Sequence, residues 1–245
     1  MKSRLAVKSH QNRSYASIDR YLWIKEHPHY IKYIHSGDVV SLKDRLCSGW
    51  QYLPQFALYP YKTNVTDAAV VNIFDVVKRM QSLELENLGK KIIAANSIGD
   101  KLLKAQLKSR LPYITHSGIF IPRRNDGLIV PGFTYGLDID KILNADEILA
   151  KVIADRQLTV LFACKSVSGN GVKAMLFLKE LLYLRDEWSH EEYKVTYHRA
   201  TDLLSKYFQQ TYHVQIDTQM KAISQPFYLF YASNLFIGKS LRSWI

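Results

Sequence analysis

Cysteine is scarce in this chain: Cys47 and Cys164 are the only two among 245 residues, and they lie far apart. They provide neither the density of a disulfide-stabilised secreted domain nor the paired spacing of a zinc-binding motif. The sequence therefore excludes a structural metal held by sulfur. It favours a reducing compartment, and we expect a cytoplasmic protein.

Long apolar runs are also missing, and the first twenty residues are polar and basic. A membrane-spanning helix needs roughly 20 apolar residues, and a secretory signal needs an apolar stretch near its start. We therefore expect a protein that neither spans a membrane nor is exported. Hydrophobic residues still make up 47% of the chain, which is enough to bury one large core.

Acidic residues are outnumbered, with 22 Asp and Glu against 33 Lys and Arg, and the formal net charge is +11. Such an excess suits a polyanionic partner, either nucleic acid or nucleotide phosphates. The alternative is a basic protein whose charges are only solvated.

Two of the acids, Asp138 and Asp140, lie near the end of the run G-L-I-V-P-G-F-T-Y-G-L-D-I-D-K at 127–141. In a strand they share one face, while Leu137 and Ile139 point the other way into a core. Carboxylates about 6 to 7 Å apart repel by roughly 2 to 3 kcal/mol at an effective dielectric constant of about 20. Protonation, a cationic side chain or a divalent metal can offset this repulsion. We predict Mg²⁺ or Mn²⁺, and the alternative is a strand end with two solvated acids.

A second motif is K-S-V-S-G-N-G-V-K at 165–173, between strands predicted over 159–164 and 174–178. Backbone N–H groups, serine hydroxyls and flanking lysines together favour binding of a phosphate tail. The loop is not a P-loop, because the required glycine and lysine spacing is absent. A plain glycine hairpin turn is the alternative, and it explains the glycines but not the serines and lysines.

Basic side chains gather in two further places. A helix is predicted over 98–109, and three of its lysines fall at spacings of three and four, which places them on one face. A pair of arginines also precedes the acidic strand. We predict that these residues contact nucleic-acid phosphates, although a solvated helix face is the common alternative: Lys101, Lys104, Lys108, Arg123 and Arg124.

Apolar periodicity predicts most of the remaining elements. His27-Pro28-His29 with Tyr30 invites comparison with a rolling-circle nickase, but proline is a poor central-strand residue, so a surface loop is favoured. The predicted helices span 17–33, 42–53, 67–80, 144–156 and 191–209, and further strands span 213–217 and 226–231.

Four motifs, in this order, resemble the primase-polymerase domain of the archaeo-eukaryotic primase superfamily, especially the form found at the N-terminus of virulence-associated-E-like replication proteins of bacterial mobile elements. They are L-P-Y-I-T-H-S-G-I-F at 111–120, G-L-D-I-D at 136–140, S-V-S-G-N-G-V-K at 166–173 and V-Q-I-D at 214–217. The resemblance covers about residues 61–240. It implies an α+β, two-lobed fold with an RRM-like catalytic sheet in 61–245, behind a helical extension in 1–60.

The resemblance also implies an activity, template-directed nucleotidyl transfer with two divalent ions, Mg²⁺ or Mn²⁺. Asp138, Asp140 and Asp217 match the catalytic metal ligands. Many primases have histidine where this chain has Lys173. The implied partners are a single-stranded DNA template, nucleoside triphosphates and a replicative helicase. The residues that match the triphosphate loop are Ser166, Ser168, Gly169, Asn170, Gly171 and Lys173.

The chain departs from that family after the third aspartate. An acid and an arginine are usual there, whereas this chain has Ala222 and Gln225. A catalytically weakened module that only binds single-stranded nucleic acid therefore stays open. A metal-dependent phosphodiesterase or toprim-type nuclease also uses D-x-D, but it needs an upstream glutamate, and Glu84 and Glu86 lie in a predicted helix-loop region.

Overall fold

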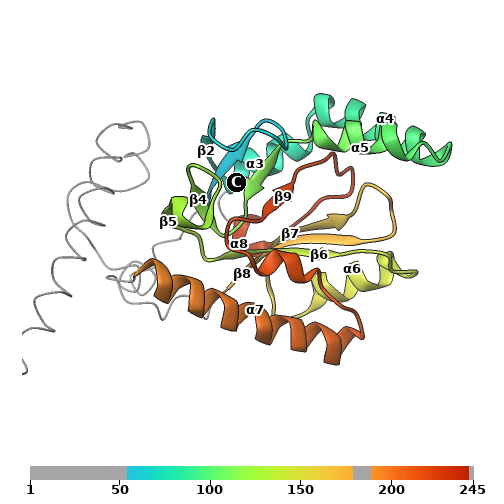
Figure 1. Ribbon diagram of the computed structural model, residues 1–245. Helices are drawn as coiled ribbons and strands as arrows, with labels where there is room; N and C mark the ends of the chain where they lie inside the picture. Colours follow the sequence, from blue (N-terminus) through green and yellow to red (C-terminus); the bar gives the residue numbers. More distant parts are fainter. Residues whose placement is uncertain (1–53, 179–188, 243–245) are drawn as a thin grey trace, which may run out of the picture.

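The computed structural model describes residues 54–178 and 189–242, which form a mixed α+β fold with two four-stranded antiparallel sheets and a two-stranded one. Figure 1 shows helices α6 and α7 on one side of the second sheet, with the first sheet and helices α4 and α5 on the other. The helices predicted over 17–33 and 42–53, and the His27-Pro28-His29 motif, lie outside the described residues.

The first sheet has the order β2-β1-β3-β9, with every neighbouring pair antiparallel. Its first strand lies among the residues assigned to the N-terminal extension, yet it pairs with both β2 and β3. The strands are β1 (Gln55–Tyr59), β2 (Ala69–Asn72), β3 (Tyr113–Thr115) and β9 (Pro226–Tyr228).

The helix predicted over 67–80 is wrong in its first half. Val70 and Val71 belong to strand β2, where they lie opposite Ala57 and Phe56. Cross-strand packing of β-branched side chains outweighs their place in an apolar helical pattern. Helix α3 (Ile73–Met80) begins only after Asn72, whose side chain accepts hydrogen bonds from the first-turn amides in a complete capping box.

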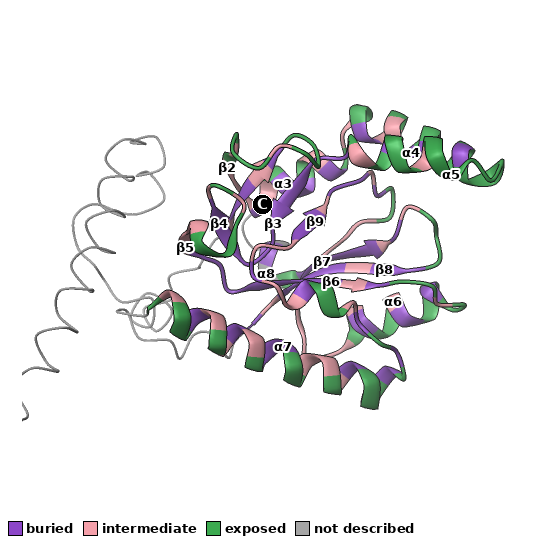
Figure 2. Ribbon diagram, in the orientation of Figure 1, coloured by how far each residue is buried: buried purple, intermediate pink, exposed green. Residues whose placement is uncertain are grey.

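Two helices follow as a hairpin, α4 (Leu83–Ser97) and α5 (Lys101–Ser109). The helix predicted over 98–109 is confirmed, with its start moved to Lys101 because Gly99 adopts a positive φ of 74° and Asp100 caps the first turn. Most side chains of this hairpin are exposed (Figure 2).

The second sheet has the order β10-β7-β8-β6 and carries the acidic motif. Leu137 and Ile139 are fully buried, as the alternation predicts. The strand predicted over 159–164 is confirmed, and the one predicted at 174–178 begins two residues earlier. The bounds are β6 (Thr134–Ile139), β7 (Thr159–Lys165), β8 (Val172–Phe177) and β10 (Phe236–Ile237).

Both predicted helices of this half are present, as α6 (Ala145–Ala154) and α7 (His190–Tyr212). Asn144 precedes α6 but makes no side-chain cap bond, and its side-chain amide donates instead to the Glu147 carboxylate at 2.9 Å. Along α7, Tyr193 and Tyr197 are buried, and the buried side faces the sheet (Figure 2).

Short elements complete the described fold: β4 (Gly118–Phe120), η2 (Asn125–Gly127), β5 (Leu128–Pro131), η4 (Thr218–Lys221) and α8 (Lys239–Arg242). The strand predicted over 213–217 is not formed, and that over 226–231 is limited to β9. None of the helices in the described ranges has the length and apolarity needed to cross a membrane.

Candidate functional site

Asp138 and Lys173 form the centre of the site. They lie opposite each other in the β6–β8 pairing, and the Lys173 ammonium forms an ion pair with the Asp138 carboxylate. Their side chains are only 15% and 14% exposed. Burial raises the pKa of Asp138 above its ordinary value; Lys173 opposes this shift, and Asp140 and Asp217 add to it. The Asp138 Oδ1 atom is buried and has no hydrogen-bond partner among the described residues.

This face of β6 points toward the first sheet. A Cβ at Gly136, two residues before Asp138, would meet Phe227 of β9 at 2.6 Å, and the Lys173 ammonium lies 5.7 Å from the centre of the same ring. The acidic site therefore lies between the two four-stranded sheets, on the side that α4 and α5 also occupy (Figure 1).

Asp140 is exposed and directly follows the last residue of β6. Its Oδ1 atom would be 3.2 Å from a Cβ built at Gly171, so it lies against the loop that joins β7 to β8. Its charge raises the pKa of Asp138, in accord with two neighbouring carboxylates on one face.

Asp217 reaches the same place from a distant part of the sequence. Its backbone N–H donates to the Asp138 carbonyl at 2.8 Å, and its charge raises the pKa values of both Asp138 and Tyr135. Its Oδ1 accepts from the Gln219 N–H at 2.9 Å, which caps η4. The structure thus brings the three predicted acids together, although residues 214–217 are not a strand.

The arrangement is not a ready-made metal cage. Within residues 54–178 and 189–242, no three His, Cys, Asp or Glu side chains are grouped so as to hold a metal ion. One Asp138 oxygen forms the ion pair with Lys173, and one Asp217 oxygen accepts the hydrogen bond that caps η4. Even so, three carboxylates are the hard oxygen donors that Mg²⁺ and Mn²⁺ prefer, and the unpartnered Asp138 Oδ1 is an available ligand. The donor chemistry fits a divalent cation, but in this arrangement the three carboxylates are not grouped around one.

The β7–β8 loop is a tight hairpin. The Ser166 N–H donates to the Gly171 carbonyl at 2.8 Å, and the Gly169 N–H donates to the Ser166 carbonyl at 2.9 Å, with Gly169 at a φ of 78°. Both amides therefore donate to carbonyls of the turn itself and are not available to a phosphate. The glycine hairpin alternative explains this backbone conformation. A side chain at Gly171 would strike the Ile139 carbonyl at 2.5 Å, which explains that glycine.

The polar side chains of this loop bond to one another. Ser166 and Ser168 hydroxyls lie 3.2 Å apart, and Ser168 donates to the Asn170 side-chain oxygen at 2.5 Å. Lys165 pairs with Asp146 at 2.9 Å, whereas Lys173 turns toward Asp138. What the loop offers an anion is therefore its hydroxyls and Lys173 rather than an open nest of amides.

The predicted basic residues divide into two groups. Lys104 and Lys108 lie across from the β7–β8 loop, while Lys101 is exposed at the start of α5. Arg123 and Arg124 lie on the β4–β5 connection, at the opposite end of the molecule from that loop (Figure 1). There Arg123 stacks 5.2 Å from the centre of the Tyr113 ring and Arg124 pairs with Asp126 at 2.8 Å.

His116 is a buried residue that supports the site. It lies in the motif at 111–120, but the sequence predicted no role for it. Its Nδ1 accepts from the Gly136 N–H at 3.1 Å, and the Tyr197 hydroxyl lies 3.1 Å from the same nitrogen. Burial disfavours the charged ring and lowers its pKa to about 3. A neutral imidazole therefore holds β6 two residues before Asp138.

This buried histidine predicts a pH dependence of stability. Its pKa is lower in the folded state, so the unfolded chain binds the proton first, and the contribution present above about pH 6.5 is lost as pH falls toward 3. We expect a loss of roughly 2 kcal/mol between pH 6.5 and pH 5 from this group. Urea unfolding of wild type and His116→Phe at both pH values measures it, and equal pH slopes in the two proteins would contradict it.

Comparison with known proteins gives one match. The family described as BT4734-like, N-terminal domain matches residues 106–236, more than half of the chain. The matched region contains the three acids, the β7–β8 loop and Lys108. No curated protein and no solved structure matches the chain.

Proposed function

The chain belongs to the family of BT4734-like N-terminal domains, and from its site we propose that it is a template-directed nucleotidyltransferase of primase-polymerase type. Asp138, Asp140 and Asp217 would hold Mg²⁺ or Mn²⁺ in a two-metal site. The observation that supports this most is the bond from the Asp217 N–H to the Asp138 carbonyl, which fixes a third acid beside the D-x-D pair. The antiparallel second sheet, with α6 and α7 on one face, supports an RRM-like catalytic half of a two-lobed primase fold.

The roles of the residues follow from phosphoryl-transfer chemistry, which depends on positioning and charge stabilisation. Divalent ions would supply activation of the attacking 3′-hydroxyl and neutralisation of the leaving pyrophosphate. Asp138, mostly buried, is held in place by the pairing of the edge strand β6 with β8. Lys173 neutralises Asp138 in the free protein. Released from Asp138, it would supply a positive charge to a phosphate bound at Ser166 and Ser168.

The proposed partners are nucleoside triphosphates, a single-stranded DNA template and a replicative helicase, in the cytoplasm. The formal charge of +11 supports binding of template phosphates without sequence preference. Lys101, Arg123 and Arg124 are the exposed or surface-lying cations proposed to contact that template. Their binding should weaken steeply as salt concentration rises.

The test is nucleotide incorporation by the full chain. A single-stranded DNA template is incubated with ribo- or deoxyribonucleoside triphosphates and either Mg²⁺ or Mn²⁺, and products are resolved by length. We expect products that require both template and metal and that disappear with EDTA. Absence of product with every metal and nucleotide, from a folded protein that binds the template, would refute the enzymatic proposal.

A second candidate is a module on the same fold that binds single-stranded nucleic acid without chemistry. Two observations favour it: Lys173 already occupies the Asp138 carboxylate, and Ala222 and Gln225 stand where the resemblance expects charges. It predicts salt-sensitive binding and no metal-dependent product. The phosphodiesterase alternative is weaker, because Glu84 and Glu86 lie in the first turn of α4 and pair with Arg79 and Lys90.

A further inference from the structure

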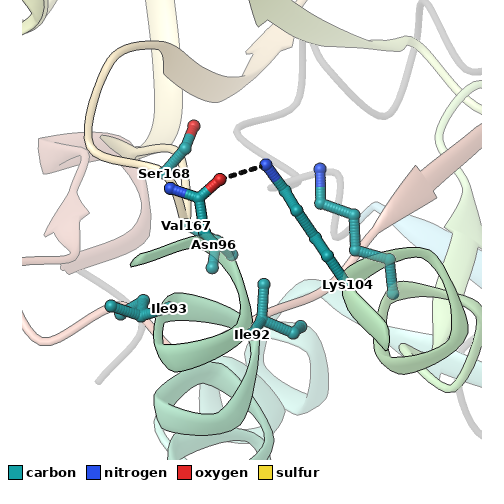
Figure 3. A pocket seen from close by; sticks show the side chains of 7 residues that line it. Ile92, Ile93, Asn96, Lys104, Val167 and Ser168 are labelled. Carbon is teal, nitrogen blue, oxygen red and sulfur yellow. Dashed lines mark hydrogen bonds between the residues drawn. The ribbon is translucent and has the colours of Figure 1, made fainter. Parts of the chain in front are cut away.

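A small cavity lies between the α4–α5 hairpin and the β7–β8 loop. Its volume is about 40 Å³. Figure 3 shows Asn96 and Ile92 from α4, Lys104 from α5, and Val167 and Ser168 from the loop around it. Lys108 completes the polar wall. The cavity therefore joins a helical hairpin to the loop that the primase resemblance assigns to the triphosphate.

The charged residues that line this cavity are both positive. Lys104 and Lys108 stand one helical turn apart, and no acidic side chain lines the cavity. Neither lysine forms an ion pair with any residue in the described ranges. The Lys104 ammonium donates instead to the neutral Asn96 side-chain oxygen at 2.5 Å (Figure 3). Two like charges at this spacing destabilise a helix slightly, and an anion between them removes that cost.

Lys108 connects the cavity to the acids. Its overall surface is largely exposed, yet desolvation of its charged end lowers its pKa, and Lys104 lowers it further. Asp140 and Asp138 act in the opposite direction on the same group. Gly171, at the end of the same loop, lies against Asp140, so the loop that lines the cavity also contacts an acid of the site.

We propose that this cavity receives the terminal phosphate of the incoming nucleoside triphosphate, held by Lys104, Lys108 and the Ser168 hydroxyl. The inference rests on the proposed function and deepens it, because it moves two lysines of α5 from the template to the nucleotide. At about 40 Å³ the cavity holds little more than one water. Entry of a phosphate therefore requires the α4–α5 hairpin and the loop to move apart, and Lys104 to exchange Asn96 for a phosphate oxygen.

The test compares ligands that differ only in their phosphates. The full chain, and its Lys104→Ala and Lys108→Ala variants, are titrated with ATP, with AMP and with a single-stranded oligonucleotide. A charge-assisted hydrogen bond contributes about 1.5 to 3 kcal/mol, which is roughly a tenfold to hundredfold change in affinity. We expect each variant to lose at least about tenfold in ATP affinity and to keep its AMP affinity and most of its oligonucleotide affinity.

Matched variants separate this site from general charge effects. Lys91→Ala removes the same charge from the exposed face of α4, outside the cavity, and should leave ATP affinity unchanged. Lys108→Arg keeps the charge and should recover part of the ATP affinity. Equal losses for ATP and AMP, or a loss confined to the oligonucleotide, overturn the inference. Lysine-dependent ATP binding by a wild type that makes no product contradicts the proposed polymerase and leaves the cavity assignment standing.

Discussion

Replacing Asp138 with alanine should abolish metal-dependent nucleotide incorporation. The carboxylate is buried on β6, and one of its oxygens has no partner in the described structure. Under the proposed function, the substitution removes a metal ligand. Loss of metal-based charge stabilisation costs several kcal/mol in the transition state, which is about a thousandfold or more in rate. Quantifying product per enzyme under saturating nucleotide measures the effect.

Control variants show whether the loss of incorporation comes from the missing carboxylate or from a damaged fold. Asp67→Ala removes an exposed acid that bonds only in its own loop, and it should retain full incorporation. Asp138→Asn keeps the shape of the side chain and should be as inactive as alanine. Both Asp138 variants should bind single-stranded DNA at least as well as wild type, because the net charge becomes more positive. Incorporation by Asp138→Ala at the wild-type rate would contradict the assignment of Asp138 as a metal ligand.

Strands β6, β7 and β8 of the second sheet could be predicted because their signals are local. The period of two in β6 places Asp138 on one face and Leu137 on the other, and both positions agree with the structure. The β2 segment could not be predicted in this way. Val70 and Val71 fit a helical period, and only their pairing with Ala57 and Phe56 makes them a strand.

The assembly of the site depends on tertiary contacts that no local sequence pattern predicts. No periodicity indicates that Asp217 bonds to the backbone of Asp138; only the order of the primase-like motifs predicted their approach. The lysine stripe of α5 predicted a shared face correctly, but its direction depends on how the α4–α5 hairpin packs over the β7–β8 loop. In the same way, Arg123 and Arg124 precede the acidic strand in the sequence, but the β4–β5 connection places them at the other end of the fold from the β7–β8 loop.

Adding a single methyl group at Gly136 should destabilise the fold strongly. A Cβ there would lie 2.6 Å from the Phe227 ring, 2.9 Å from Met220 Cε and 3.1 Å from His116 Cγ. Met220 can shift, but the buried rings of Phe227 and His116 cannot move without disturbing both sheets. Overpacking of this kind costs about 1 to 3 kcal/mol, so Gly136→Ala should lower the free energy of unfolding by that amount.

The same substitution at Gly89 should have the opposite sign. Gly89 is buried in the middle of α4, where a Cβ would meet only Tyr231 Cβ at an ordinary 4.0 Å. Alanine there should raise the free energy of unfolding by about 0.5 to 1 kcal/mol, because glycine loses more backbone entropy in a helix. Urea unfolding of both variants measures the two effects. Destabilisation by both would mean that buried glycines of this fold respond to added volume in general. Opposite signs would tie the Gly136 effect to the close approach of β6, His116 and β9, the packing that places Asp138 between the two sheets.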